Sequence, residues 1–122
     1  MCKIESEKTY SFDNIFWSLE SNDPRFSKQE DVYNCLGPPL VDDAFRGLNC
    51  CIFAYGQTGS GKTYTMFGRN DSKDEEGIIP RLCHDIFEKG INLDKDVSEF
   101  HIVVSYMEIY NEKVFDLLNP KA

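Results

Sequence analysis

The chain has 122 residues, and its 13 Lys and Arg against 21 Asp and Glu give it a formal net charge of -8 at pH 7. This acidic balance argues against nucleic acid or an anionic membrane as a direct partner, and no apolar run reaches the roughly 18 residues of a membrane span. The length fits one domain, and the first ten residues carry neither a secretory nor an amphipathic targeting pattern, so a cytosolic or nuclear setting is expected.

The first third of the chain predicts a strand and then a helix. Residues 9–17 have the apolar pattern of a strand that runs into a bend. Ser27 and Glu30 have the spacing of a capping box, which predicts a helix over about residues 28–47. The sequence GPP at residues 37–39 interrupts this helix, so we expect a kink or two short helices, because proline removes an amide donor.

The middle of the chain predicts a buried strand followed by two helical segments. CCIFAY, residues 50–55, is apolar without alternation, as in a strand that helices cover on both faces. A helix begins at Lys62 and is broken by FGRNDSKDEEG, residues 67–77, whose acidic part we interpret as a solvated loop. An apolar stripe at helical spacing then predicts a helix over residues 78–89, with Gly90 as its C-terminal cap.

The last part of the chain predicts a long strand and a short helix. FHIVVSYMEI, residues 100–109, is rich in the residue types that strands prefer. NEKVFDLL, residues 111–118, reads as a short capped turn of helix.

Five cysteines are odd in number and contain no C-x-x-C pair, which indicates reduced, buried thiols rather than disulfides. They are Cys2, Cys35, Cys50, Cys51 and Cys83. A metal site of Cys83, His84 and His101 is an alternative, but its spacing matches no common zinc pattern.

GQTGSGKT, residues 56–63, satisfies G-x-x-x-x-G-K-[ST] between a predicted buried strand and a predicted helix. Its glycines let the backbone approach a phosphate closely, successive amides of residues 58–61 can point inward as a nest, and the helix N-terminus adds partial positive charge. Lys62 would lie between the β- and γ-phosphates, and the Thr63 hydroxyl would be a ligand of the bridging Mg²⁺. The alternative is a glycine-rich turn that only joins a strand to a helix.

A phosphate cradle alone is not an ATPase, because hydrolysis also needs a group at the γ-phosphate and one that orients water. The only D-x-x-G, residues 74–77, lies in the acidic loop without a preceding apolar strand, so we interpret it as coincidence. We therefore predict no catalytic residue within this chain.

FAYGQTGSGKTYTMFG at 53–68, GIIPR at 77–81 and SYMEIYNEKVFDLLNP at 105–120 together resemble the kinesin motor domain. FDNIFWS and QEDVY resemble the strand and first helix that precede these motifs in the family. The resemblance spans nearly the whole chain, and the tryptophan-serine insert is most similar to the cargo-transporting branch numbered three.

The resemblance implies an α/β fold, part of a three-layer P-loop NTPase with a central β-sheet and helices on both faces. It implies a cytoplasmic motor that binds ATP and Mg²⁺ and couples ATP hydrolysis to movement along microtubules. It places Tyr64 near the adenine, where we expect its ring to stack, and matches residues 67–77 to a loop that binds inhibitors in some kinesins. The candidate nucleotide-binding residues are Gly56, Gln57, Thr58, Gly59, Ser60, Gly61, Lys62, Thr63 and Tyr64, with Thr63 as the metal ligand.

The resemblance also implies that residues 1–122 are a partial motor domain. The family's opening strand with R-x-R-P would lie before residue 1, and its two switch segments and main microtubule-binding elements would lie after residue 122. We therefore expect the chain alone to be poorly stable and not hydrolytically competent. We expect the motor to contact tubulin mostly through parts outside residues 1–122. The alternative is a short free-standing protein that binds nucleotide or a partner without hydrolysis.

Overall fold

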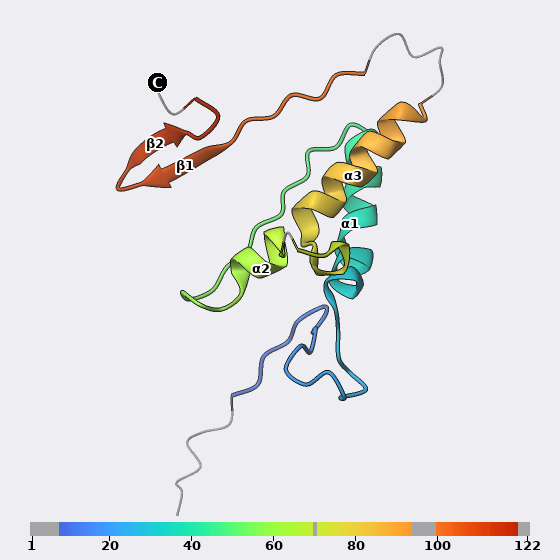
Figure 1. The fold of residues 1–122 in the computed structure, drawn as a ribbon, viewed down its shortest axis with the longest axis vertical. Helices are drawn as coiled ribbons and strands as arrows, with labels where there is room; N and C mark the ends of the chain where they lie inside the picture. Colours follow the sequence, from blue (N-terminus) through green and yellow to red (C-terminus); the bar gives the residue numbers. More distant parts are fainter. Residues whose placement is uncertain (1–7, 70, 94–99, 120–122) are drawn as a thin grey trace, which may run out of the picture. The chain divides into compact units, whose positions relative to one another are not determined.

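The computed structural model describes residues 8–69, 71–93 and 100–119, and it falls into two units, residues 1–89 and 90–122, that we describe separately. Figure 1 shows three helices, a 3-10 turn and one hairpin. These elements are α1 (Gln29–Phe45), α2 (Lys62–Phe67), η1 (Lys73–Glu75), α3 (Ile78–Ile91), β1 (Met107–Tyr110) and β2 (Lys113–Asp116). Helices with a small antiparallel sheet agree with the expected α/β class. Within the described residues, none of the helices has the length and apolar character needed to cross a membrane.

Helix α1 is a single helix that contains both prolines, so of the two expected alternatives, a kink or two short helices, the second is wrong. Tyr33, Gly37 and Val41 recur every fourth residue and form its buried face. The Tyr33 ring lies so close to Gly37 that an added Cβ there would come within 2.2 Å of a ring carbon. Burial of this face on both sides of the prolines offsets the loss of the helical hydrogen bonds that proline cannot donate.

The start of α1 also differs from the predicted capping box. The helix begins at Gln29, and the Lys28 N–H donates to Asp31 Oδ2 at 2.7 Å. Asp31 therefore has the role that the sequence pattern gave to Glu30, one position later than expected.

Helices α1 and α3 lie side by side and run in the same direction (Figure 1). Tyr33 of α1 donates its hydroxyl hydrogen to Asp85 of α3, and Lys89 of α3 donates to Asp42 of α1. Burial, together with the hydrogen bond to Asp85, raises the pKa of the Tyr33 phenol well above its usual value. Two polar contacts at different heights thus fix the relative rotation of the two helices.

Helix α3 agrees closely with its predicted range, but its end is different. Ile78, at its first position, is 2% exposed and is one of three buried apolar side chains among the described residues. Pro80 lies in the first turn, where the missing N–H costs no helical bond. The helix continues to Ile91, so Gly90 lies inside its last turn and is not the predicted cap.

Residues 50–55 do not form the predicted strand. They run as an extended segment beside the helices, shown in green in Figure 1, and no described segment pairs with them. Phe53 is 82% and Tyr55 95% exposed, whereas Ile52 faces an apolar hollow lined in part by Leu82. An apolar run becomes a strand only when neighbouring strands take up its N–H and C=O groups, and the described residues offer none.

The strand expected near the start of the chain is not formed. Residues 9–17 show no strand, and only an isolated bridge joins Trp17 to Phe26.

The four described cysteines, Cys35, Cys50, Cys51 and Cys83, are free thiols, as expected, but they are exposed rather than buried. Cys2 lies outside the described residues.

The C-terminal unit contains a hairpin where a turn of helix was predicted. β1 pairs antiparallel with β2, and Tyr110 stands opposite Lys113. The two residues between them, Asn111 and Glu112, have φ angles of 54° and 62°. Two left-handed residues are typical of the tight turns whose twist matches paired strands. The strand expected over residues 100–109 is shorter in the structure, where it begins at Met107 and ends at Tyr110.

Candidate nucleotide-binding site

The predicted phosphate loop connects the extended segment 50–55 to helix α2. Gly59 and Gly61 have φ angles of 80° and 90°, and Gly61 is the N-cap residue of α2. A Cβ added at either glycine would meet nothing within 4 Å. Glycine is needed at these two positions because of backbone conformation and not because of crowding.

Lys62 bends back over this loop. Its Nζ donates to the carbonyl oxygens of Gly56 and Gln57, each at 2.8 Å. A lysine ammonium has three donors and no acceptor, so the two carbonyl oxygens hold its charge at the concave side of the loop. Phosphate oxygens that enter the loop would compete for the same donors, and a charged acceptor makes the stronger hydrogen bond.

The remaining loop residues only partly match the expected geometry. Thr58, Gly59 and Thr63 are exposed, and Thr63 lies in the first turn of α2. The Ser60 N–H, one of the amides expected in an inward nest, donates instead to the Gln57 carbonyl oxygen at 3.2 Å. The chain thus brings all nine predicted residues into one loop and the first turn of α2. The Ser60 N–H already donates within the loop and does not point inward as expected.

Tyr64 contacts the segment that follows α2. Its hydroxyl donates to Glu75, and the Arg69 guanidinium lies 5.8 Å from the centre of its ring. The hydrogen bond to Glu75, followed by burial, raises the pKa of the Tyr64 phenol. The residue is 41% exposed. Its stacking on an adenine stays a prediction.

The acidic loop after α2 is exposed over residues 71–74, as expected of a solvated loop, and hydrogen bonds close it on itself. Its two ends meet where Gly68 and Glu76 form an antiparallel bridge and the Gly77 N–H donates to Phe67 O at 3.1 Å. The Arg81 guanidinium closes the loop from α3 by donating to the carbonyl oxygens of Glu76, Lys73 and Asp74 at 3.0, 3.0 and 3.2 Å. The D-x-x-G at residues 74–77 therefore belongs to a closed turn, and its interpretation as coincidence stays a prediction.

Sequence reasoning missed Gln29. Its side chain is buried, with 6% of the residue exposed, and its Nε2 donates to the Tyr64 carbonyl oxygen of α2 at 2.7 Å. A glutamine at the start of a helix carries no pattern that identifies a partner 35 residues away, so no sequence signal could have found this contact.

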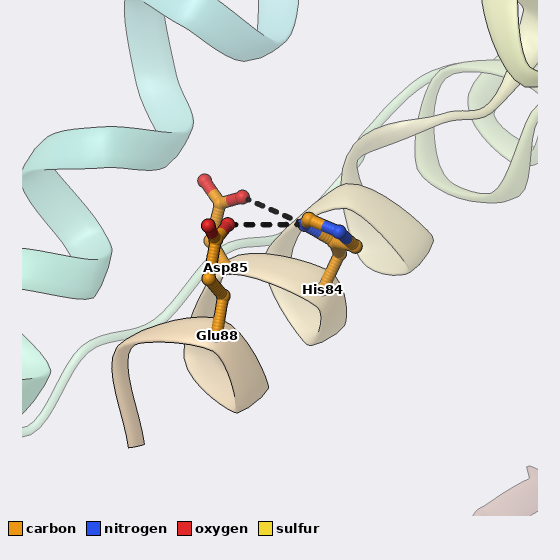
Figure 2. A group of neighbouring side chains, drawn as sticks. All are labelled: His84, Asp85 and Glu88. Carbon is orange, nitrogen blue, oxygen red and sulfur yellow. Dashed lines mark hydrogen bonds and ion pairs between the residues drawn. The ribbon is translucent and has the colours of Figure 1, made fainter. Parts of the chain in front are cut away.

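One group of side chains in the described residues has the composition of a metal site, and it differs from the predicted alternative. His84 Nδ1 lies 3.4 Å from Asp85 Oδ1 and 3.7 Å from Glu88 Oε2, and Figure 2 shows both carboxylates turned toward the imidazole. All three side chains come from neighbouring turns of α3, and those of His84 and Glu88 are 72% and 64% exposed. Asp85 also accepts the hydrogen bond from Tyr33. Polar contacts between neighbouring side chains of one helix account for this arrangement, so we assign it no metal.

Comparison with known proteins identifies the family. The model of the kinesin motor domain matches residues 2–122. The kinesin-like protein unc-104 of Caenorhabditis elegans is 55% identical over 115 residues, which cover 93% of this chain and 7% of that protein.

Two mammalian relatives give the same result. Human kinesin-like protein KIF13B is 50% identical over 116 residues (94% of this chain and 6% of that protein), and rat kinesin-like protein KIF1A is 49% identical over 118 residues (96% and 7%). The chain thus spans less than a tenth of the length of these relatives. The relatives confirm the resemblance to the third kinesin branch. The chain belongs to the kinesin motor domain family.

Proposed function

We propose that residues 56–64 bind ATP with Mg²⁺ and that the complete protein couples ATP hydrolysis to movement along microtubules in the cytoplasm. The observation that carries the proposal is the position of Lys62, whose Nζ is held at 2.8 Å from two carbonyl oxygens of the loop. A positive charge beside the loop supports the proposal, because the β- and γ-phosphates of a nucleotide need a cation there. Family membership supports the same assignment.

The residues present fit a nucleotide and its metal ion. The loop is free of side-chain atoms beside Gly59 and Gly61, where an added Cβ would have no neighbour within 4 Å. Phosphate oxygens can therefore approach the backbone there. Lys62 would bind the β- and γ-phosphates, and the exposed Thr63 would supply a hydroxyl ligand. The Mg²⁺ would supply neutralisation of the phosphate charge.

We further propose that other segments of the complete protein supply the groups that sense the γ-phosphate and orient the attacking water. Two observations support this division. Residues 74–77, the only D-x-x-G, are part of the turn that Arg81 closes. The exposed Phe53 and Tyr55 also indicate that the segment leading into the loop needs neighbouring strands from elsewhere. Binding to acidic microtubules would use other segments too, because this chain has a net charge of -8.

Substitution of Lys62 in the complete gene product tests the proposal. Lys62→Ala removes both the charge and its donors, so we expect the affinity for a fluorescent ADP analogue to fall about 100-fold, which corresponds to roughly 2.7 kcal/mol. Microtubule-stimulated ATP hydrolysis should fall with it. Lys113→Ala, on the exposed strand β2, is the matched control and should leave both unchanged.

Equal nucleotide affinity in the parent and Lys62→Ala proteins would refute the assignment of the phosphate loop. ATP hydrolysis by residues 1–122 alone would refute the proposed division of labour instead. The two results are separate, because the first concerns binding and the second concerns the source of the hydrolytic groups.

A further inference from the structure

We propose that Gln29 is a positioning residue for the nucleotide: it holds helix α2, and with it Lys62 and Thr63, in the orientation that binds phosphate. The inference rests on the proposed function and adds to it a residue that lies outside the phosphate-loop motif. It depends on the hydrogen bond from Gln29 Nε2 of α1 to the Tyr64 carbonyl oxygen of α2, at 2.7 Å.

Tyr64 lies where a contact has most effect on the loop. It directly follows Lys62 and Thr63 in the same turn of α2, so a fixed Tyr64 carbonyl also fixes the backbone that carries both side chains. That carbonyl is one of the last four of α2, a helix of 6 residues, and such carbonyls lack partners within the helix. Gln29 therefore satisfies a group that the helix itself leaves open.

Apolar packing does little to hold α2. None of its six residues is buried. The other described bonds that leave the helix are made by Lys62 to the loop carbonyl oxygens, by the Tyr64 side chain to Glu75, and at the far end, where Gly77 N–H donates to Phe67 O at 3.1 Å. Thr65 and Met66 are half-buried and none of the six residues is fully buried, so polar contacts contribute much of what fixes the rotation of α2.

Gln29 itself is well suited to transmit position. It is the first residue of α1, and only 6% of it is exposed, in contrast to the exposed Glu30 beside it. Four residues on, Tyr33 joins α1 to α3 through Asp85. The amide of Gln29 thus connects the phosphate-binding turn to the pair of helices that forms the core of this unit.

The test uses the complete gene product and a fluorescent ADP analogue with Mg²⁺. Gln29→Met keeps the side-chain length but removes the donor, and we expect it to weaken binding by the folded fraction about tenfold. Gln29→Glu presents only oxygen acceptors to the Tyr64 carbonyl oxygen and should weaken binding at least as much. Glu30→Met, on the same turn but exposed, is the control and should bind as the parent does.

A double-mutant cycle separates a positioning role from a general structural one. If Gln29 acts through Lys62, then Gln29→Met should weaken ADP binding much less in a Lys62→Ala background than in the parent. Additive losses would overturn the inference, as would Gln29 variants whose folded fraction binds ADP within twofold of the parent. If Gln29→Met does not fold, Gln29→Glu in the two backgrounds decides the question in the same way.

Failure of this inference is distinguishable from failure of the proposed function. A parent protein that binds no nucleotide would refute the phosphate loop itself. A parent that binds ADP, loses it on Lys62→Ala, and is indifferent to both Gln29 substitutions would refute only the positioning role.

Discussion

Replacement of Gly59 by alanine isolates the cost of backbone strain in the phosphate loop. Gly59 has a φ of 80°, and an added Cβ would meet no atom within 4 Å, so Gly59→Ala introduces strain without a clash. A non-glycine residue in this region costs roughly 1–2 kcal/mol. If the loop relaxes to avoid the strain, it must recover the left-handed conformation when it binds, so we expect nucleotide affinity to fall about 5- to 30-fold.

Gly47 provides a matched control in the turn after α1. Its φ is 81°, and an added Cβ there also meets nothing within 4 Å, so Gly47→Ala carries the same strain away from the loop. Both variants should lower thermal stability by a similar amount, on the order of 2–4 °C for each kcal/mol in a domain of motor size. Only Gly59→Ala should weaken binding of the fluorescent ADP analogue.

Two results would refute this reasoning. If Gly59→Ala binds ADP as tightly as the parent, the left-handed loop conformation is not the one that binds phosphate. If Gly47→Ala weakens ADP binding to the same degree, the effect comes from global destabilisation and not from the loop. Gly68→Ala sets the scale for a real clash, since its added Cβ would lie 2.0 Å from the Glu75 carbonyl oxygen, and it should destabilise the protein more than either.

Three further predictions concern side chains around the site. Tyr33→Phe removes the buried hydroxyl that donates to Asp85 and should lower the free energy of unfolding by about 1–2 kcal/mol in urea titrations. Because the pKa of Tyr33 is raised in the folded state, the stabilisation by its hydroxyl is full below the unfolded pKa of 10.0 and decreases as the pH rises above that value. The difference in unfolding free energy between the parent and Tyr33→Phe should therefore shrink above pH 10. A constant difference would contradict the assignment. Tyr64→Ala should weaken nucleotide binding several-fold if the ring stacks on adenine, and affinity equal to that of the parent would exclude stacking. Arg81→Gln removes the cation that closes the acidic loop on three carbonyl oxygens and should speed proteolytic cleavage within residues 67–77, with no change expected in the cleavage of other segments.

The sequence predicted well those features that depend on neighbouring residues. The ranges of α2 and α3 follow from local sequence signals, and the structure agrees with them to within two residues, although α3 runs past its expected cap at Gly90. The phosphate loop before α2 and its glycines were also expected, because left-handed glycines and the following lysine belong to one short motif. These are local properties of the chain.

Features that depend on distant partners were predicted less well. Residues 50–55 have a strand composition but no ladder partner among the described residues, so they remain extended and exposed. The hairpin within residues 107–116 was not predicted, and its turn at Asn111 and Glu112 lacks the glycine that usually marks a two-residue hairpin. The contact of Gln29 with Tyr64 joins segments with no shared pattern.

The unpaired segment 50–55 has a consequence for the order of events during synthesis. Under the proposed function, its pairing partners belong to other segments of the complete protein, and pairing over long separations is slow. The phosphate loop follows this segment directly, so its anchorage is completed late, after helices α1 and α3 have formed from local interactions. A newly made chain would therefore acquire its nucleotide affinity near the end of folding. Until then, its exposed apolar edge would be a binding site for chaperones.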